Sequence, residues 1–143
     1  MGMMTADISA YILANIGAPW VDPATDSTNG NLYQQFYPPS SPDRMCCVYE
    51  RVGAPPQRSL GGVIAWHNTR LVVMNRCAAS DGFAVAQADA FSIFNLLKTV
   101  VNQTLSGTFY MEILPDGEPE AQSLDPSTRP IFITNFKVMK RTS

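Results

Sequence analysis

Apolar side chains recur at intervals of three and four residues through the segment 83–101, and this periodicity predicts an amphipathic helix. A helix of this length would span about 30 Å, and its apolar stripe is wide enough to cover one face of a sheet. The segment 7–16 shows the same spacing on a smaller scale, with Ile8 and Ile12 on one side, and Gly17 follows it as a stop signal. The sequence therefore predicts one long helix and one short N-terminal helix.

Strands are predicted wherever side chains alternate with a period of two or form a short apolar run. The segments with this pattern are 32–37, 44–52, 63–67, 70–78, 108–114 and the stretch from Ile131 onward. Both faces of 44–52 are largely apolar, which predicts an interior strand. Only Asn68 and Thr69 separate 63–67 from 70–78, so these two segments form either a hairpin or one long bent strand.

Two long polar segments, 18–31 and 115–130, are predicted to be surface loops. Strands come in runs and the helices are segregated from them, which is typical of an α+β domain. We therefore expect an α+β fold, with a mainly antiparallel sheet, a long helix packed on one face and a short N-terminal helix. A chain of 143 residues is predicted to be a single domain, 1–143.

Composition favours association with other proteins. Charged residues make up 15% of the chain, below the ~25% of an average domain, which favours burial of further surface in an oligomer. The formal net charge of −2 provides no long-range attraction to nucleic acid, and this argues against a nucleic-acid-binding module. No apolar run approaches 18 residues, so no membrane span is expected. Three cysteines do not make a disulfide framework, and reduced thiols in a cytosol are expected.

Few residues could carry chemistry. His67 is the only histidine, and no nucleophile signature surrounds it. Cys46 and Cys47 are adjacent, so in a strand they point to opposite faces and cannot both reach one metal ion. The phosphate-binding glycine motifs are absent as well. The sequence predicts no catalytic, cofactor-binding or metal-binding residue, and a small enzyme or ligand-binding domain using His67 and Cys77 is the alternative of a different class.

Basic side chains fall in the predicted strands and their connections, whereas acids concentrate near 7–26 and 112–125. They are either ordinary solvated charges, or regions of opposite sign that meet between subunits, or a basic inner rim that tolerates passing DNA. The subunit or partner interface is predicted to include Arg51, Arg58, Arg70, Arg76, Lys137, Lys140 and Arg141.

Three stretches together carry a family resemblance. The segments "CVYERVGAPPQRSLGG" (47–62), "RLVVMNRCAASDGFAVAQADAFSIFNLL" (70–97) and "RPIFITNFKVMKR" (129–141) resemble, in order and spacing, the tailed-bacteriophage minor capsid or tail terminator (tail completion) family. The residues that match the shared pattern are interpreted as structural: Gly53, Pro55, Pro56, Arg129, Pro130, Phe132, Asn135 and Phe136.

The resemblance implies an α+β subunit without catalytic residues that assembles into a sixfold ring. Such a ring terminates the tail tube and joins it to the head connector, with the tail tube protein and a head-completion or connector protein as partners and DNA only passing through. The expected location is the tail or neck of the virion, with assembly in the host cytoplasm. A head-completion or neck connector protein is the alternative within the same class. The loops 53–62 and 115–130 are expected to be mobile arms that order on assembly, and the terminal strand is expected to face the core helix on one side and a neighbouring copy on the other.

Overall fold

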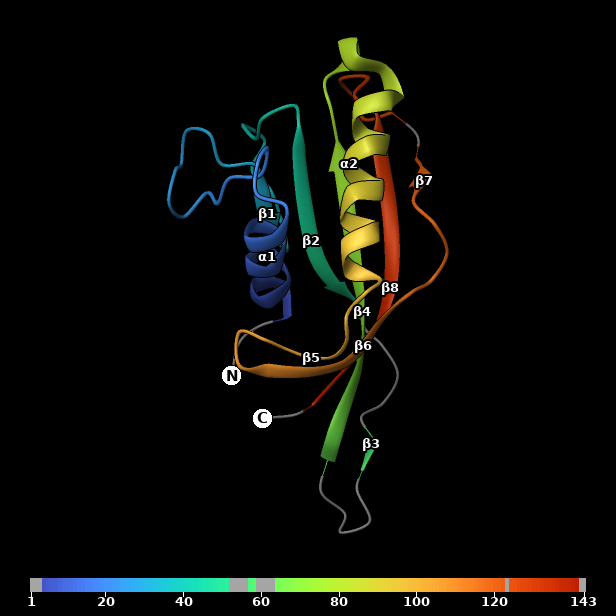
Figure 1. The fold of residues 1–143 in the computed structure, drawn as a ribbon. Coiled ribbons are helices and arrows are strands. Elements are labelled where there is room, and N and C mark those ends of the chain that lie inside the picture. The colour runs from blue at the N-terminus through green and yellow to red at the C-terminus, as the bar shows by residue number, and fades with distance from the viewer. Residues whose placement is uncertain (1–3, 52–56, 59–63, 123, 142–143) are drawn as a thin grey trace.

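The computed structural model describes residues 4–51, 57–58, 64–122 and 124–141, and the eight strands of these residues form one curled sheet (Figure 1). The order across the sheet is β1 (Leu32–Gln34), β2 (Met45–Arg51), β4 (Ile64–Arg76), β8 (Ile131–Arg141), β6 (Thr108–Pro115) and β5 (Val101–Leu105). β1 runs parallel to β2, whereas the other neighbours along this order are antiparallel. Two short strands lie off this order, with β3 (Gln57–Arg58) on β4 and β7 (Glu120–Ala121) on β8.

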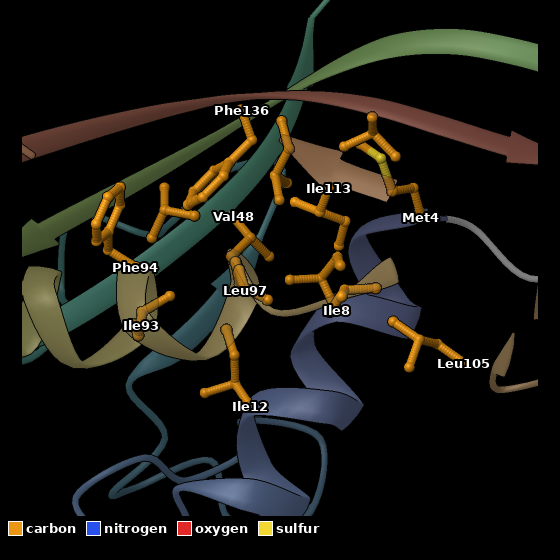
Figure 2. Packing of buried hydrophobic residues seen from close by; sticks show 14 of the residues in the cluster. Met4, Ile8, Ile12, Val48, Ile93, Phe94, Leu97, Leu105, Ile113 and Phe136 are labelled. Carbon is orange, nitrogen blue, oxygen red and sulfur yellow. The ribbon is translucent and has the colours of Figure 1, made fainter. Parts of the chain in front are cut away.

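Two helices, α1 (Met4–Asn15) and α2 (Gly82–Leu97), pack on the same face of this sheet (Figure 1). A short 3-10 helix, Ala79–Asp81, leads into α2. Ile8 and Ile12 of α1 and Leu97 of α2 meet the sheet residues Val48 and Phe136 in one buried cluster (Figure 2). The structure therefore has the predicted α+β class, with a sheet that is mixed because of β1.

α2 is shorter than predicted. It ends at Leu97 rather than near Val101, and Thr99 caps the last turn by donating a hydrogen bond to the carbonyl oxygen of Leu96 at 2.7 Å. Val100 is buried, as the helical periodicity required, but Val101 is 58% exposed and begins β5. Thr99, Val100 and Val101 are β-branched, and three such side chains in succession disfavour a helix. The sequence did not predict β5, because its residues show no apolar alternation.

β4 settles the alternative for the middle of the chain, because it is one long strand rather than a hairpin. Its pairing with β8 runs without interruption from Trp66 opposite Arg141 to Arg76 opposite Ile131. β8 lies between β4 and β6, so the terminal strand is central in the sheet. Its side chains divide as predicted, with Phe132, Thr134, Phe136 and Val138 buried toward the helices.

A buried hydrogen bond joins two segments that are far apart in the sequence. The Tyr110 hydroxyl donates to the Asp7 carboxylate at 2.7 Å, which links β6 to the first turn of α1. Burial, together with this carboxylate, raises the pKa of Tyr110, so the hydroxyl keeps its proton. Asp7 is 2% exposed, and its charge therefore depends on the phenol for solvation.

We expect Tyr110→Phe to lower the free energy of unfolding by about 1–3 kcal/mol, because it leaves a buried carboxylate without its donor. Urea unfolding followed by circular dichroism measures this difference. The double variant Tyr110→Phe with Asp7→Leu is expected to recover part of the loss, since it removes both polar partners. A double variant less stable than Tyr110→Phe alone would contradict this interpretation.

Candidate interaction surface

The cysteines lack the features of reactive groups. Burial raises the pKa of Cys47 to about 11 and that of Cys46 well above its ordinary value, so both thiols are protonated at pH 7. The two side chains lie on opposite faces of β2, as predicted, with Cys46 in the core beneath the helices and Cys47 on the other face. Burial also raises the pKa of Cys77.

His67 and Cys77 do not share a site. His67 lies in the N-terminal half of β4 and Cys77 follows its last residue, so ten residues of extended chain separate them. At about 3.3 Å per residue this is roughly 30 Å. Within the described ranges, no group of three or more His, Cys, Asp and Glu side chains could hold a metal ion. The enzyme hypothesis that combined these two residues therefore lacks a site.

Arg76 belongs to the interior of the protein. It lies on the face of the sheet opposite the helices, and its side chain is 3% exposed. Its guanidinium donates hydrogen bonds to the Ser41 hydroxyl at 3.0 Å and to the carbonyl oxygens of Pro42 and Asp43 at 2.7 and 3.2 Å. These bonds hold the loop before β2 across the end of the sheet. Arg76 was predicted as an interface residue, but its donors are already used within the chain.

Asp125 anchors the loop 115–130 to the same place. Its carboxylate lies 2.8 Å from the Arg129 guanidinium and 3.9 Å from that of Arg76, and Arg129 also contacts Asp43 at 3.1 Å. Burial opposes ionisation of Asp125, but hydrogen bonds from the backbone and side chain of Arg129 outweigh it and lower the pKa. The expectation that the whole of 115–130 is a mobile arm is therefore wrong at its C-terminal end. The loop 53–62 lies outside the described residues except for 57–58.

Three cations form a row across the helix-free face. Arg51 on β2 is paired with Arg70 on β4, and Arg70 is paired with Lys137 on β8. Alternation along each strand places all three on the face opposite the helices, and all three are exposed. Like charges directly opposite each other on neighbouring strands destabilise a sheet. Asp116, 3.4 Å from Arg70, forms the one ion pair found for this row among the described residues. We call Arg51, Arg70 and Lys137 the basic row.

A groove of about 300 Å³ adjoins the basic row. Its lining comes from the three adjacent strands β4, β8 and β6, and comprises Asn68, Thr69, Arg70, Glu112, Leu114, Lys137, Val138 and Met139. Leu114 of β6 is a large apolar residue, and its side chain is 48% exposed. Apolar side chains thus lie beside two cations and one carboxylate, and such a mixture suits a protein surface better than a small polar ligand.

The remaining predicted interface residues are dispersed. The Arg141 guanidinium lies over the rings of Trp66 and Phe109, at 5.4 and 4.8 Å from their centroids, beyond the groove. Lys140 is paired with His67 on the opposite face of the sheet. The side chain of Arg58 lies outside the described part. Sequence reasoning found the cations but missed the groove, because its lining depends on which strands are neighbours.

Two solved structures share this fold over nearly the whole chain. One is a chain from the virion of native gene transfer agent (GTA) particle, with a TM-score of 0.67 at 15% sequence identity, covering 97% of this chain and 95% of that chain. The fold therefore occurs in a virion. A second solved chain shares the fold with a TM-score of 0.57 at 14% identity, covering 99% of this chain and 98% of that chain. No protein-family model and no curated protein matches the sequence. Among the helices of the described residues, none is both long and apolar enough to span a membrane.

Proposed function

We propose that the chain is a structural virion protein that forms a ring, terminates a tail tube and joins it to the head connector. The observation that carries this proposal is the shared fold with a chain of a virion, which extends from one end of the sequence to the other. The likeness concerns the fold, and the more specific role rests on the sequence resemblance to tail terminator proteins together with the surface described above.

The surface supports assembly rather than catalysis. The groove is open, and none of the three cysteines is among the residues that line it. The basic row lies across strands whose other face is already occupied by the helices. A charged, partly apolar face on a rigid sheet is a suitable surface for setting the orientation of a neighbouring subunit.

The proposed assembly is a hexameric ring located in the tail or neck of the virion and assembled in the host cytoplasm. Its proposed partners are the tail tube protein on one side and a head-completion or connector protein on the other, with DNA passing through the opening. The number six and these partners derive from the sequence resemblance, and the subunit fold is compatible with them.

Electron microscopy of particles assembled without this chain tests the proposed role. We expect full heads together with detached tails of uncontrolled length, because no ring would stop tube growth or join the tube to the head. Tails of normal length beside leaky, tailless heads would contradict termination and favour the head-completion alternative. Normal complete particles would exclude both roles.

A further inference from the structure

We propose that the basic row and the adjoining groove bind a second copy of this chain, with Phe36 of that copy in the groove and its Asp22 against the basic row. Phe36 and Asp22 lie beside the edge strand β1, and we call the surface around them the β1 edge. This inference rests on the proposed function and specifies the contact from which the ring is built. It commits to a contact between two different surfaces of the same chain.

The basic row needs an anionic partner. Arg70 is directly opposite Arg51 on one side and Lys137 on the other. Among the described residues, the one ion pair found for these three cations joins Arg70 to Asp116, whose carboxylate is partly exposed. Like-charge cross-strand pairs weaken a sheet, so this arrangement is a cost within the isolated subunit. An acidic surface placed over the row would remove that cost and would gain attraction.

The groove favours a protein over a nucleic-acid backbone. Leu114 and Met139 supply apolar contact area, and Glu112 would repel phosphate groups. A closed cavity of about 150 Å³ accepts a benzene molecule, so an open groove of about 300 Å³ has room for a phenyl ring. A partner with one exposed aromatic side chain next to a carboxylate fits both features.

The β1 edge of the same chain has these properties. Phe36 is 76% exposed, the highest value among the large apolar side chains of the described residues, and it follows Gln35, which has a positive φ of 68°. Phe36 and Asp22 line the same shallow hollow of about 250 Å³. Aromatic side chains exposed in this way are typical anchors of protein interfaces.

Charge is distributed unevenly along the sequence in a way that supports this contact. Residues 1–43 contain four aspartates and no lysine or arginine, so their formal charge is −4. Residues 44–143 contain all ten cations and the other eight acids, so their formal charge is +2, which accounts for the total of −2. The β1 edge belongs to the acidic segment 1–43, whereas the basic row and the groove belong to the segment 44–143, which has a net positive formal charge.

The two surfaces lie on different parts of the sheet. β1 is an edge strand of the sheet (Figure 1). The residues that line the groove belong to β4, β8 and β6. A contact between two different surfaces is heterologous, and repetition of a heterologous contact produces a closed ring when the rotation between copies closes. A twofold contact would join identical surfaces and stop at a dimer.

Cysteine cross-linking between two co-expressed variants tests this contact. One copy carries Phe36→Cys and the other Leu114→Cys, and the native thiols are buried. After mild oxidation we expect a disulfide between the two different variants and none within either population alone. Val101→Cys, at another exposed strand position, replaces Leu114→Cys as the control and is expected to give no cross-link.

Association measured by sedimentation provides the second readout. We expect Phe36→Ala to weaken self-association by roughly tenfold to thirtyfold. Lys137→Met is also expected to weaken self-association. Its melting temperature is expected to be unchanged or higher, because the substitution relieves repulsion between cations within the sheet. Phe83→Ala and Lys98→Met are the matched controls on α2 and at its end, and neither is expected to change association. The pair Lys137→Glu with Asp22→Lys is expected to restore association that Lys137→Glu alone reduces.

Several outcomes would overturn the inference. Cross-links between two Phe36→Cys copies would show a twofold contact, and duplex DNA bound by the free chain and released by Lys137→Met would make the basic row a DNA surface. Absence of any cross-link would also reject the contact. Particles lacking the chain that still show detached, overlong tails would then leave the proposed function standing, whereas complete particles would reject the function as well.

Discussion

Replacement of Phe136 with alanine is expected to lower the free energy of unfolding by about 3–5 kcal/mol. Phe136 is 1% exposed and belongs to β8, which lies between β4 and β6. Its ring lies 6.3 Å from that of Phe94 on α2, so it joins the terminal strand to the helix layer (Figure 2). Removal of the ring leaves a cavity in a position that neighbouring strands on both sides hold in place, and little collapse can compensate.

Phe36→Ala is the matched control for this substitution, because it makes the same chemical change at an exposed position. Chemical denaturation of the two variants under conditions where the chain is monomeric gives both values. We expect Phe36→Ala to change the free energy of unfolding by no more than about 0.5 kcal/mol. Similar effects of the two substitutions would show that β8 does not hold the core together.

Replacement of Asp125 with alanine is expected to lower the free energy of unfolding by about 2–3 kcal/mol. The carboxylate accepts hydrogen bonds from the backbone N–H groups of Ser127 and Arg129, at 3.0 and 2.8 Å, and it lies near the guanidinium groups of Arg129 and Arg76. Without it, two neighbouring cations remain near each other, and one of them is buried. Urea unfolding measures the loss.

Glu118→Ala is the control, since Glu118 is an exposed acid of the same loop. We expect this control to change the free energy of unfolding by no more than about 0.5 kcal/mol. Equal losses of unfolding free energy for Glu118→Ala and Asp125→Ala would show that Asp125 stabilises the fold only through its negative charge and not through its specific contacts.

The Asp125 contribution also has a defined pH dependence. The pKa of Asp125 is lowered in the folded chain, so its stabilisation is complete above the unfolded value of about 3.9 and is lost as pH falls through the folded value. The difference in unfolding free energy between the native chain and Asp125→Ala is therefore expected to be larger at pH 7 than at pH 3. A difference that grows on acidification would contradict the assigned role.

Much of the fold was predictable from local patterns. The alternation from Ile131 onward identified which side chains of β8 face the helices, and the apolar faces of 44–52 identified β2 as an interior strand. These predictions succeed because burial on one face imposes a period of two. The start of α2 followed from periodicity, whereas its end depended on the β-branched residues Thr99, Val100 and Val101 and on pairing with β6.

The surface was less predictable, because it depends on register. Arg51, Arg70 and Lys137 are far apart in sequence and become neighbours only through the pairing of β2, β4 and β8. Arg76 and Arg70 look alike in sequence, since both are cations in the same strand and on the same face. One is buried because the loops around Ser41 and Asp125 fold over it, and no local pattern encodes that contact.

The most direct test of the proposed ring is an electron cryo-microscopy map of the intact particle, fitted with this subunit. We predict a closed ring of six copies between the head connector and the uppermost layer of the tail tube. Absence of the subunit from that position, or its presence only elsewhere in the particle, would contradict the proposed role.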